Sequence, residues 1–576
     1  MKSEIFAICS KSFYFSHKVI WFLNSLVDSK NTTFDPDAII LEIKEISVKQ
    51  WKFCLTGSDN ISQFLNNRGD EQRDSTLQVI KNYHKGLFDG CIYTEWIPLG
   101  PFGSKEKDPY YSTLLFFDRL YEISLNLNSV SNKTEYLKNE LEHINSYLPA
   151  GVYIPFNSEG LRDCSLLNVR TSELIVYSTK EKSPYRITLE LYCPNEELKM
   201  SFEDNKQEIK LVDKNPRKSS NGSTCAFEGF NGDYLTVQEY FSENKMIRAI
   251  PEEENTGKSV SVLSDRISCM YGVETGENQQ TFIYEDFFEQ EARVRASSPY
   301  GSLISWRMVN IIVKTGDDLR QEQLAIQLFT FFQQIFNENK LNLWLHPYEI
   351  IPTHKYGGII ECVKNAVSID YLKKNLPSDQ KSLIHYFVLN FGQTNTKRFK
   401  KAREEFLKSL AGYSLACFIL KLKDRHNGNI LIDTEGHIIH IDFGFMLSNS
   451  PGGNMNFESA PFKLTEEFEQ VLGGRHSRAF NKFRRHCVEG FLALSRKAEQ
   501  IILMVEMMRT GSGASLPCFV AGEGAVDELR NRLVPFGEMS KAKCKKYINQ
   551  LIDTSLDHWT TRWYDRVQYF FQGTLY

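Results

Sequence analysis

A short polar turn between two apolar runs constrains the fold of this chain more than any other feature. The turn is Asp424–Asn429, and it lies between Phe418–Leu422 and Ile430–Ile432. A third apolar run, Ile438–Ile441, ends directly at Asp442. Short β-branched runs next to a tight polar turn indicate paired strands with the polar groups collected at one edge. The segment therefore predicts a rigid turn between strands that holds two carboxylates and an amide close together.

The spacing of these three side chains indicates a particular chemistry. Asp424 precedes Asn429 by five residues, and Asp442 follows Asn429 by thirteen. Protein kinases space their catalytic aspartate, metal-binding asparagine and metal-binding aspartate in this way. Phosphoryl transfer needs two oxygen ligands for Mg²⁺ and one carboxylate that faces the attacking hydroxyl. We therefore predict that Asn429 and Asp442 bind the metal and that Asp424 or His426 accepts the proton.

A lysine at the end of an apolar strand supplies the second signal. Val309–Val313 is followed by Lys314, a Gly316 turn and then a carboxylate-rich helix start that contains Glu322. A lysine in such a position is costly to bury without a partner, and Glu322 lies one turn into the helix, where it can reach back. We predict that Glu322 orients Lys314 and that Lys314 holds two phosphates of a nucleotide.

Two departures distinguish the chain from ordinary protein kinases: the loop reads Asp-Arg-His, and Ala296–Ser302 replaces a glycine-rich loop. Here the sequence resembles the phosphatidylinositol 3- and 4-kinase family, and within it the type III beta phosphatidylinositol 4-kinases. The resemblance is dense over residues 282–576 and sparser over 111–195. The motifs that carry it are Gly316–Glu322, Lys423–Asn429, Ser298–Gly301, Asn365–Ile369, Gly436–Asp442 and Phe462–Thr465.

The resemblance implies a bilobal, protein-kinase-like lipid kinase of the α+β class. Its β-rich N-lobe and α-rich C-lobe would follow an all-α helical domain. ATP would be the cofactor, together with Mg²⁺ or, as an alternative, Mn²⁺. The residues expected around ATP, beyond Lys314 and Glu322, are Ser297 and Ser298 over the phosphates, Ile360, Glu361 and Val363 at the hinge, and Tyr348 and Ile441 on the two faces of adenine.

The substrate prediction comes from the segment Asp442–Lys463, the expected activation loop. Between its ends only Glu458 is charged. A headgroup that already carries phosphates needs Lys or Arg clusters nearby. We therefore expect unphosphorylated phosphatidylinositol as the substrate, while the 4-position rests on the subfamily resemblance. A phosphatidylinositol 3-kinase, a protein kinase on the same lobes and a non-catalytic scaffold that binds a small GTPase remain alternatives.

Composition fits this interpretation. The chain has 576 residues and a formal net charge of −4, which gives no global argument for nucleic-acid binding. Its twelve cysteines form no CxxC pair, so we predict separate thiols in a reducing compartment. We expect a cytoplasmic protein without signal peptide or membrane span, peripheral on Golgi-type membranes by resemblance, with a Rab-type GTPase as a candidate partner of the helical domain.

The chain divides by pattern into three parts. We predict a helical domain over 1–110, an N-lobe over 111–361 with a disordered insert at 201–261, and a C-lobe over 362–576. Apolar residues from Ile548 to Phe570 recur at steps of three and four, which predicts one amphipathic C-terminal helix that packs on the lobe or touches a bilayer. The expected elements are two helices in Tyr110–Leu148, alternating strand-like residues in Ala150–Pro155, strands at Glu173–Tyr177, Tyr185–Tyr192, Met308–Val313, Glu349–Ile351 and Ile359–Val363, and a helix at Leu319–Asn337.

Overall fold

The structure is a computed structural model. It describes residues 2–9, 12–26, 36, 38–44, 109–157, 161, 164–177, 182–193, 285–303, 306–377, 381–451, 459–511, 513–535 and 540–575. Among these residues, no helix has both the length and the apolar character needed to cross a bilayer.

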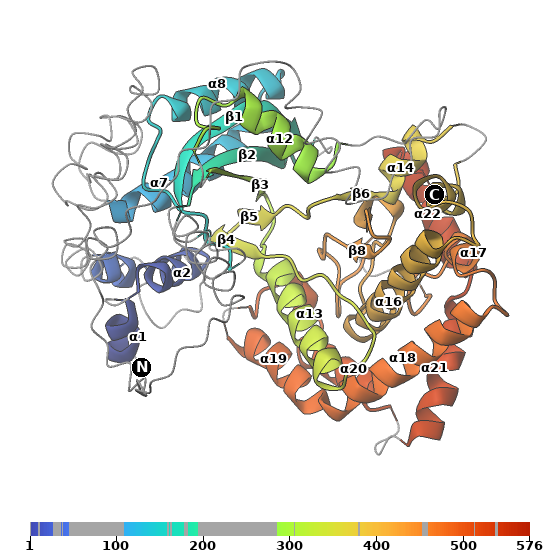
Figure 1. Ribbon diagram of the computed structural model, residues 1–576. Helices are drawn as coiled ribbons and strands as arrows, with labels where there is room; N and C mark the ends of the chain where they lie inside the picture. The colour runs from blue at the N-terminus through green and yellow to red at the C-terminus, as the bar shows by residue number, and fades with distance from the viewer. Residues whose placement is uncertain are drawn as a thin grey trace, which may run out of the picture.

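The first lobe is built on a five-stranded antiparallel sheet with the order β1-β2-β3-β5-β4 (Figure 1). Its strands are β1 (Ser165–Val176), β2 (Tyr185–Tyr192), β3 (Trp306–Thr315), β4 (Ile350–His354) and β5 (Gly357–Glu361). Strand β3 is central, because it pairs with β2 on one side and with β5 on the other. Residues of β3 up to Val313 therefore pair with β2, and the pairing with β5 continues through Lys314 and Thr315.

The two faces of this sheet have different partners, as the period-two alternation of strands requires. Odd-numbered residues of β2 and β3, such as Ile187 and Ile311, join an apolar cluster with helices α7 (Pro109–Leu127) and α8 (Lys133–Asn145). Helices α1 (Lys2–Cys9) and α2 (Phe13–Asn24) lie on the same side (Figure 1). Even-numbered residues such as Met308 pack under α12 (Phe287–Ser297).

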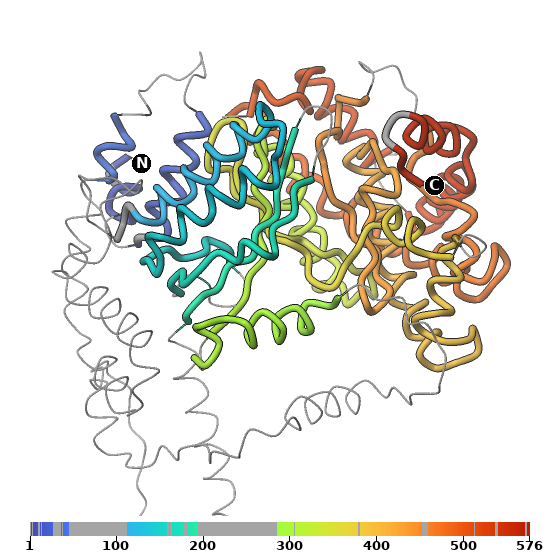
Figure 2. The backbone as a smooth tube through the Cα atoms, turned by 90° about the horizontal axis from the view of Figure 1, so that it is seen from above, coloured from blue at the N-terminus to red at the C-terminus, as the bar shows by residue number. Residues whose placement is uncertain are grey.

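The second lobe is mainly helical and shares one large core with α13 (Arg320–Glu338). Figure 2 shows it beside the first lobe, with α13 and the following strands between them. Long helices α16 (Lys397–Leu420) and α18 (Arg478–Arg496) pack against each other. The other helices are α14 (Ile369–Asn375), α15 (Leu383–Phe391), α17 (Glu466–Val471), α19 (Ala498–Thr510), α20 (Glu523–Leu533), α21 (Lys541–Ser555) and α22 (Trp559–Gln572).

A small three-stranded sheet lies in the second lobe and carries the polar turn. It contains β6 (Ala366–Ser368), β7 (Ile430–Asp433) and β8 (Ile438–His440) in that order. A short 3-10 turn, η2 (Asn427–Asn429), leads directly into β7, and a second, η3 (Pro517–Phe519), precedes α20. The polar turn therefore lies between the end of the buried helix α16 and a strand, where the sequence predicted a strand on each side.

The α+β class, with a β-rich lobe followed by an α-rich lobe, is confirmed. The expected helices and strands from Tyr110 to Asn337 are found with small shifts at their ends, except that the strand expected at Glu173–Tyr177 begins already at Ser165 and that Ala150–Pro155 differs. That segment forms no strand, and only Ala150 makes an isolated bridge to Leu166. Most of the predicted helical domain and the whole of the insert at 201–261 lie outside the described residues, so the domain boundaries stay predictions.

Two expectations were wrong. Residues 548–570 belong to two helices instead of one. The first helix ends at Ser555 and the second begins at Trp559, and Asp557 between them has a φ of 46°. Ile548 and Ile552 are buried, whereas Trp559 and Phe570 are 65% and 82% exposed. Cys164 and Cys193 form a disulfide between the start of β1 and the end of β2, where the sequence predicted only separate thiols.

Candidate active site

Lys314 lies at the end of β3 on the even-numbered face of the sheet, away from α7 and α8. Its Nζ is 2.7 Å from Oε1 of Glu322 in the first turn of α13, and 3.3 Å from Oδ2 of Asp317. Burial opposes the charge of the Lys314 ammonium, but the carboxylates of Glu322, Asp442 and Asp317 outweigh it and raise the lysine pKa well above its usual range. The predicted Lys314–Glu322 pair is present in the structure.

Gln321 connects α13 to the other lobe. Its Nε2 donates to the carbonyl oxygens of Phe443 at 2.9 Å and Gly444 at 2.7 Å. Its Oε1 accepts from the backbone N–H of Cys518 at 2.9 Å. The amide thus has partners for both of its polar atoms, and it places the start of α13 against the segment that follows Asp442.

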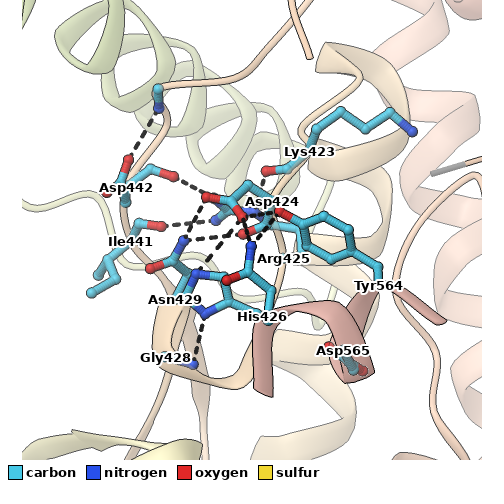
Figure 3. A network of polar contacts seen from close by, with 12 residues as sticks. Lys423, Asp424, Arg425, His426, Gly428, Asn429, Ile441, Asp442, Tyr564 and Asp565 are labelled. Atoms are coloured by element: carbon cyan, nitrogen blue, oxygen red, sulfur yellow. Dashed lines mark hydrogen bonds and ion pairs between the residues drawn. The ribbon is translucent and has the colours of Figure 1, made fainter. Parts of the chain in front are cut away.

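The polar turn and Asp442 form one hydrogen-bonded unit (Figure 3). Ile430 pairs with His440, and the N–H of Ile441 donates to the carbonyl of Asn429 at 3.1 Å, so Asn429 and Asp442 are near neighbours across the strands. Asp424 and Asp442 have φ angles of 62° and 58°. Left-handed backbone at two non-glycine residues is strained, and such strain is concentrated at functional sites.

Arg425 fixes this unit from behind. Its Nε donates to the carbonyl of Lys423, Nη1 donates to that of Ile441 at 2.8 Å, and Nη2 donates to that of Asp442. The guanidinium also lies 5.5 Å from the ring centre of Phe443. The Arg425 guanidinium thus binds backbone carbonyls, and it joins the turn to the segment that contains Asp442.

Asp424 and His426 differ in protonation. Burial raises the pKa of Asp424 to about 6, although the hydrogen bond from Tyr564 opposes the rise. Burial and the charge of Arg425 lower the pKa of His426 to about 4. Nδ1 of His426 accepts from the N–H of Gly428 at 3.1 Å, so the proton of the neutral ring lies on Nε2, which is 3.7 Å from Asp424. His426 therefore presents a donor toward Asp424, and Asp424 presents an acceptor.

The donor set fits a hard divalent cation. The Asn429 amide nitrogen donates to the carbonyl of Asp424 at 3.0 Å, which leaves the amide oxygen as the ligand atom. The Lys314 ammonium is the largest influence on Asp442 and lowers its pKa, so this side chain is a carboxylate. Among the described residues, no cluster of three or more His, Cys, Asp or Glu side chains is arranged to hold a metal alone. Two oxygen ligands suit a cation that is completed by water and substrate phosphates.

The apolar residues predicted around adenine all border the large core of the second lobe. Tyr348 is part of the large core, and Ile360, Val363 and Ile441 are partly buried against the same core. The N–H of Glu361 donates to the carbonyl of Glu349 at 2.8 Å, which ties the end of β5 to the residue before β4. Their placement around adenine stays a prediction.

Ser297 and Ser298 are the exception, because the structure does not bring them to Lys314. Ser298 donates to the buried Glu190, which pairs with Met308 in the register of β2 and β3. Ser297 accepts from Arg170 at 2.8 Å. Met308 and Lys314 are six residues apart on one strand, roughly 20 Å. The prediction that these serines cover the phosphates is therefore wrong.

Lys182 lies next to the turn that follows Lys314. Lys182, just before β2, forms an ion pair with Asp317, which in turn lies 3.3 Å from Lys314. Lys182 was not predicted from the sequence, although a lysine before a strand that pairs with β3 was a usable signal. Four further residues were not predicted because their contacts join segments far apart in the sequence: Gln321, Arg425, Tyr564 and Gln568.

Comparison with known proteins gives consistent matches. A family model described as phosphatidylinositol 3- and 4-kinase matches residues 308–517. The chain is 44% identical over 289 residues to a phosphatidylinositol 4-kinase of Dictyostelium discoideum, covering 50% of this chain and 24% of that protein. It is 47% identical over 287 residues to phosphatidylinositol 4-kinase beta 1 of Arabidopsis thaliana, covering 49% and 25%.

A longer match is to phosphatidylinositol 4-kinase beta of Rattus norvegicus, which is 34% identical over 493 residues. That match covers 78% of this chain and 58% of the rat protein. The chain thus spans less than two thirds of the length of each of these relatives.

Proposed function

Because residues 308–517 form a domain of the phosphatidylinositol 3- and 4-kinase family, we propose that the chain transfers the γ-phosphate of ATP to the 4-hydroxyl of phosphatidylinositol. The observation that carries this proposal is the meeting of Lys314 and Asp442, whose Nζ and Oδ2 atoms are 3.8 Å apart. The lysine comes from the first lobe and the aspartate from the second, so phosphates and metal would be held between the lobes. The 4-position is supported by the names of the relatives.

In the proposed step, Asp424 accepts the proton of the inositol hydroxyl as its oxygen attacks the γ-phosphorus. A new P–O bond forms to inositol, the bond from the γ-phosphorus to the β,γ-bridging oxygen breaks, and ADP leaves. The tautomer of His426 supports Asp424 as the base, because Nδ1 is occupied and Nε2 already carries its proton. We propose that His426 donates a hydrogen bond in the site.

Asn429 and Asp442 would hold Mg²⁺ or Mn²⁺ through the amide oxygen and the carboxylate. When bound, the cation neutralises charge on the phosphates. Lys314 would contact the same phosphates, held in place by Glu322 at 2.7 Å. Tyr348, Ile360, Val363 and Ile441 would surround adenine, and the backbone of Glu361 and Val363 would provide its polar contacts.

The lipid would lie beside the segment Asp442–Lys463, of which residues 452–458 are outside the described part. The near absence of charge in this sequence supports phosphatidylinositol without further phosphates as the substrate. The exposed Trp559 at the start of α22 supports contact with a bilayer surface. Golgi-type membranes and a Rab-type GTPase partner remain proposals from family resemblance.

The test is turnover of radiolabelled ATP on phosphatidylinositol vesicles, followed by separation of the 3- and 4-phosphate products. We expect phosphatidylinositol 4-phosphate alone, and little transfer to vesicles that carry only phosphatidylinositol 4-phosphate. The 3-phosphate product would establish the phosphatidylinositol 3-kinase alternative. No transfer to any lipid or protein acceptor would favour a scaffold.

A further inference from the structure

Helix α22 reaches back to the catalytic turn from the end of the chain. Tyr564 is 6% exposed, and its hydroxyl donates to Oδ1 of Asp424. Figure 3 shows the tyrosine ring directed at this carboxylate. Gln568, one turn further along α22, donates through Nε2 to the Tyr564 hydroxyl oxygen at 2.7 Å and also lies 3.3 Å from Asp424 Oδ1.

The direction of these hydrogen bonds is fixed by chemistry. An amide nitrogen only donates and an ionised carboxylate only accepts, so the hydroxyl between them must accept from Gln568 and donate to Asp424. The other carboxylate oxygen, Oδ2, faces the Asn429 amide at 3.4 Å. Both oxygens of Asp424 therefore have donors, one from its own turn and one from a helix that follows 140 residues later.

The helix is anchored next to Tyr564 and again beyond its C-terminal end. Asp565 forms a buried ion pair with Lys463, with N–O distances of 2.8 and 2.9 Å. Beyond the helix, the backbone of Leu575 accepts from Asn427 at 3.0 Å and donates to Asp370 at 2.6 Å. The position of the tyrosine hydroxyl is thus set by contacts that do not involve Asp424.

We propose that Tyr564, oriented by Gln568, is a positioning residue for phosphoryl transfer: it holds the Asp424 carboxylate facing the acceptor hydroxyl. The inference rests on the proposed function for the reaction that it serves. The left-handed backbone at Asp424 fixes the main chain but does not itself set the side-chain torsion angles. A base displaced by a fraction of an ångström loses much of its effect, so a donor that restricts this rotation raises kcat.

The test is Tyr564→Phe, which removes the hydroxyl and keeps the ring. We expect kcat to fall about ten- to a hundredfold, while KM for ATP changes by less than about twofold. Gln568→Leu leaves the hydroxyl free to turn and should give a smaller loss of the same kind. Tyr569→Phe, on the neighbouring and more exposed position of the same helix, is the matched control and should keep kcat within about twofold.

A double-mutant cycle separates positioning from a structural role. Combined with Asp424→Asn, Tyr564→Phe should cost less than about twofold, because the carboxylate on which it acts is gone. Equal losses on the wild-type and Asp424→Asn backgrounds, or an unchanged kcat for Tyr564→Phe, would overturn the proposal. If Tyr564→Phe does not fold, Gln568→Leu takes its place in the same cycle.

The cycle is measured with radiolabelled ATP on whichever acceptor the wild-type chain phosphorylates. Wild-type transfer to phosphatidylinositol decides the proposed function, and the shape of the cycle decides the role of Tyr564. A failure of the proposed function can therefore be told apart from a failure of the role proposed for Tyr564.

Discussion

The two sides of the candidate site are built in different ways. On the phosphate side, Lys314, Asp317 and Glu322 lie within nine residues, on the end of β3 and the start of α13. On the acceptor side, Asp424 is held by Asn429 from its own turn and by Tyr564 from a helix near the end of the chain. The first side is local in sequence, and the second depends on the packing of the whole second lobe.

This difference predicts which kinetic parameter a substitution on each side should change. Changes on the phosphate side should alter the use of ATP, since they move the ammonium that contacts the phosphates. Changes on the acceptor side should alter kcat with little change in KM for ATP. The following variants test that division, beginning with the residue where the two sides meet.

Asp442→Asn should have the largest effect, because Asp442 is the carboxylate in the proposed metal set and also lies 3.8 Å from Lys314. An amide lacks the charge to hold the cation between phosphates, so we expect less than about a hundredth of wild-type lipid phosphorylation. Turnover of radiolabelled ATP measures it, with melting temperature as a check on the fold. Asp527→Asn, at an exposed site on α20, is the matched control. If Asp442→Asn keeps more than about a hundredth of wild-type activity, Asp442 is not a metal ligand.

Glu322→Gln should lower kcat/KM for ATP about ten- to a hundredfold, since the neutral amide no longer fixes the Lys314 ammonium. Glu338→Gln, exposed at the far end of α13, should leave it unchanged. Steady-state rates at varied ATP separate the two parameters. A fall in kcat alone, with KM for ATP unchanged, would contradict the division between the two sides.

The pH profile tests which group on the acceptor side takes the proton. With a pKa of about 6, Asp424 is ionised and able to accept a proton above that pH and is protonated below it. We expect kcat to fall about tenfold for each pH unit below about 6. Because phosphate groups titrate in the same range, kcat is measured at saturating nucleotide and metal. If kcat instead begins to fall only below about pH 4, His426 would be identified as the base.

The smallest effect should come from the outer surface of α22. Trp559 is 65% exposed, and its loss removes apolar area available to a bilayer surface. Trp559→Ser should weaken vesicle binding about three- to tenfold in a sedimentation assay and leave turnover of a soluble short-chain lipid unchanged. Leu503→Ser on α19, where the side chain is 57% exposed, is the control for general loss of surface apolarity. Equal loss of binding in both variants would exclude a special role for α22.

The same contrast explains what could be predicted from the sequence. The Lys314–Glu322 pair and the Asp424–Asn429 turn were predicted because each depends on spacing within fewer than ten consecutive residues. The contact of Tyr564 with Asp424 was not, because nothing local to either residue specifies which helix covers the turn. Ser298 was misplaced for a related reason: its order before β3 was right, but it packs at the Trp306 end of the strand.

The contacts of Arg425 and Gln321 have a consequence for inhibitor design. Together they donate four hydrogen bonds to the backbone carbonyls of Ile441, Asp442, Phe443 and Gly444. Phe443 is fully buried, with its ring edge-on to Phe329 at 5.0 Å. A compound that requires Asp442–Gly444 to move away from Arg425 and Gln321 must offset those bonds, roughly 1 to 3 kcal/mol each. Selective ligands for this chain should therefore bind with these four hydrogen bonds intact. They should gain contacts at the adenine side and near Lys182.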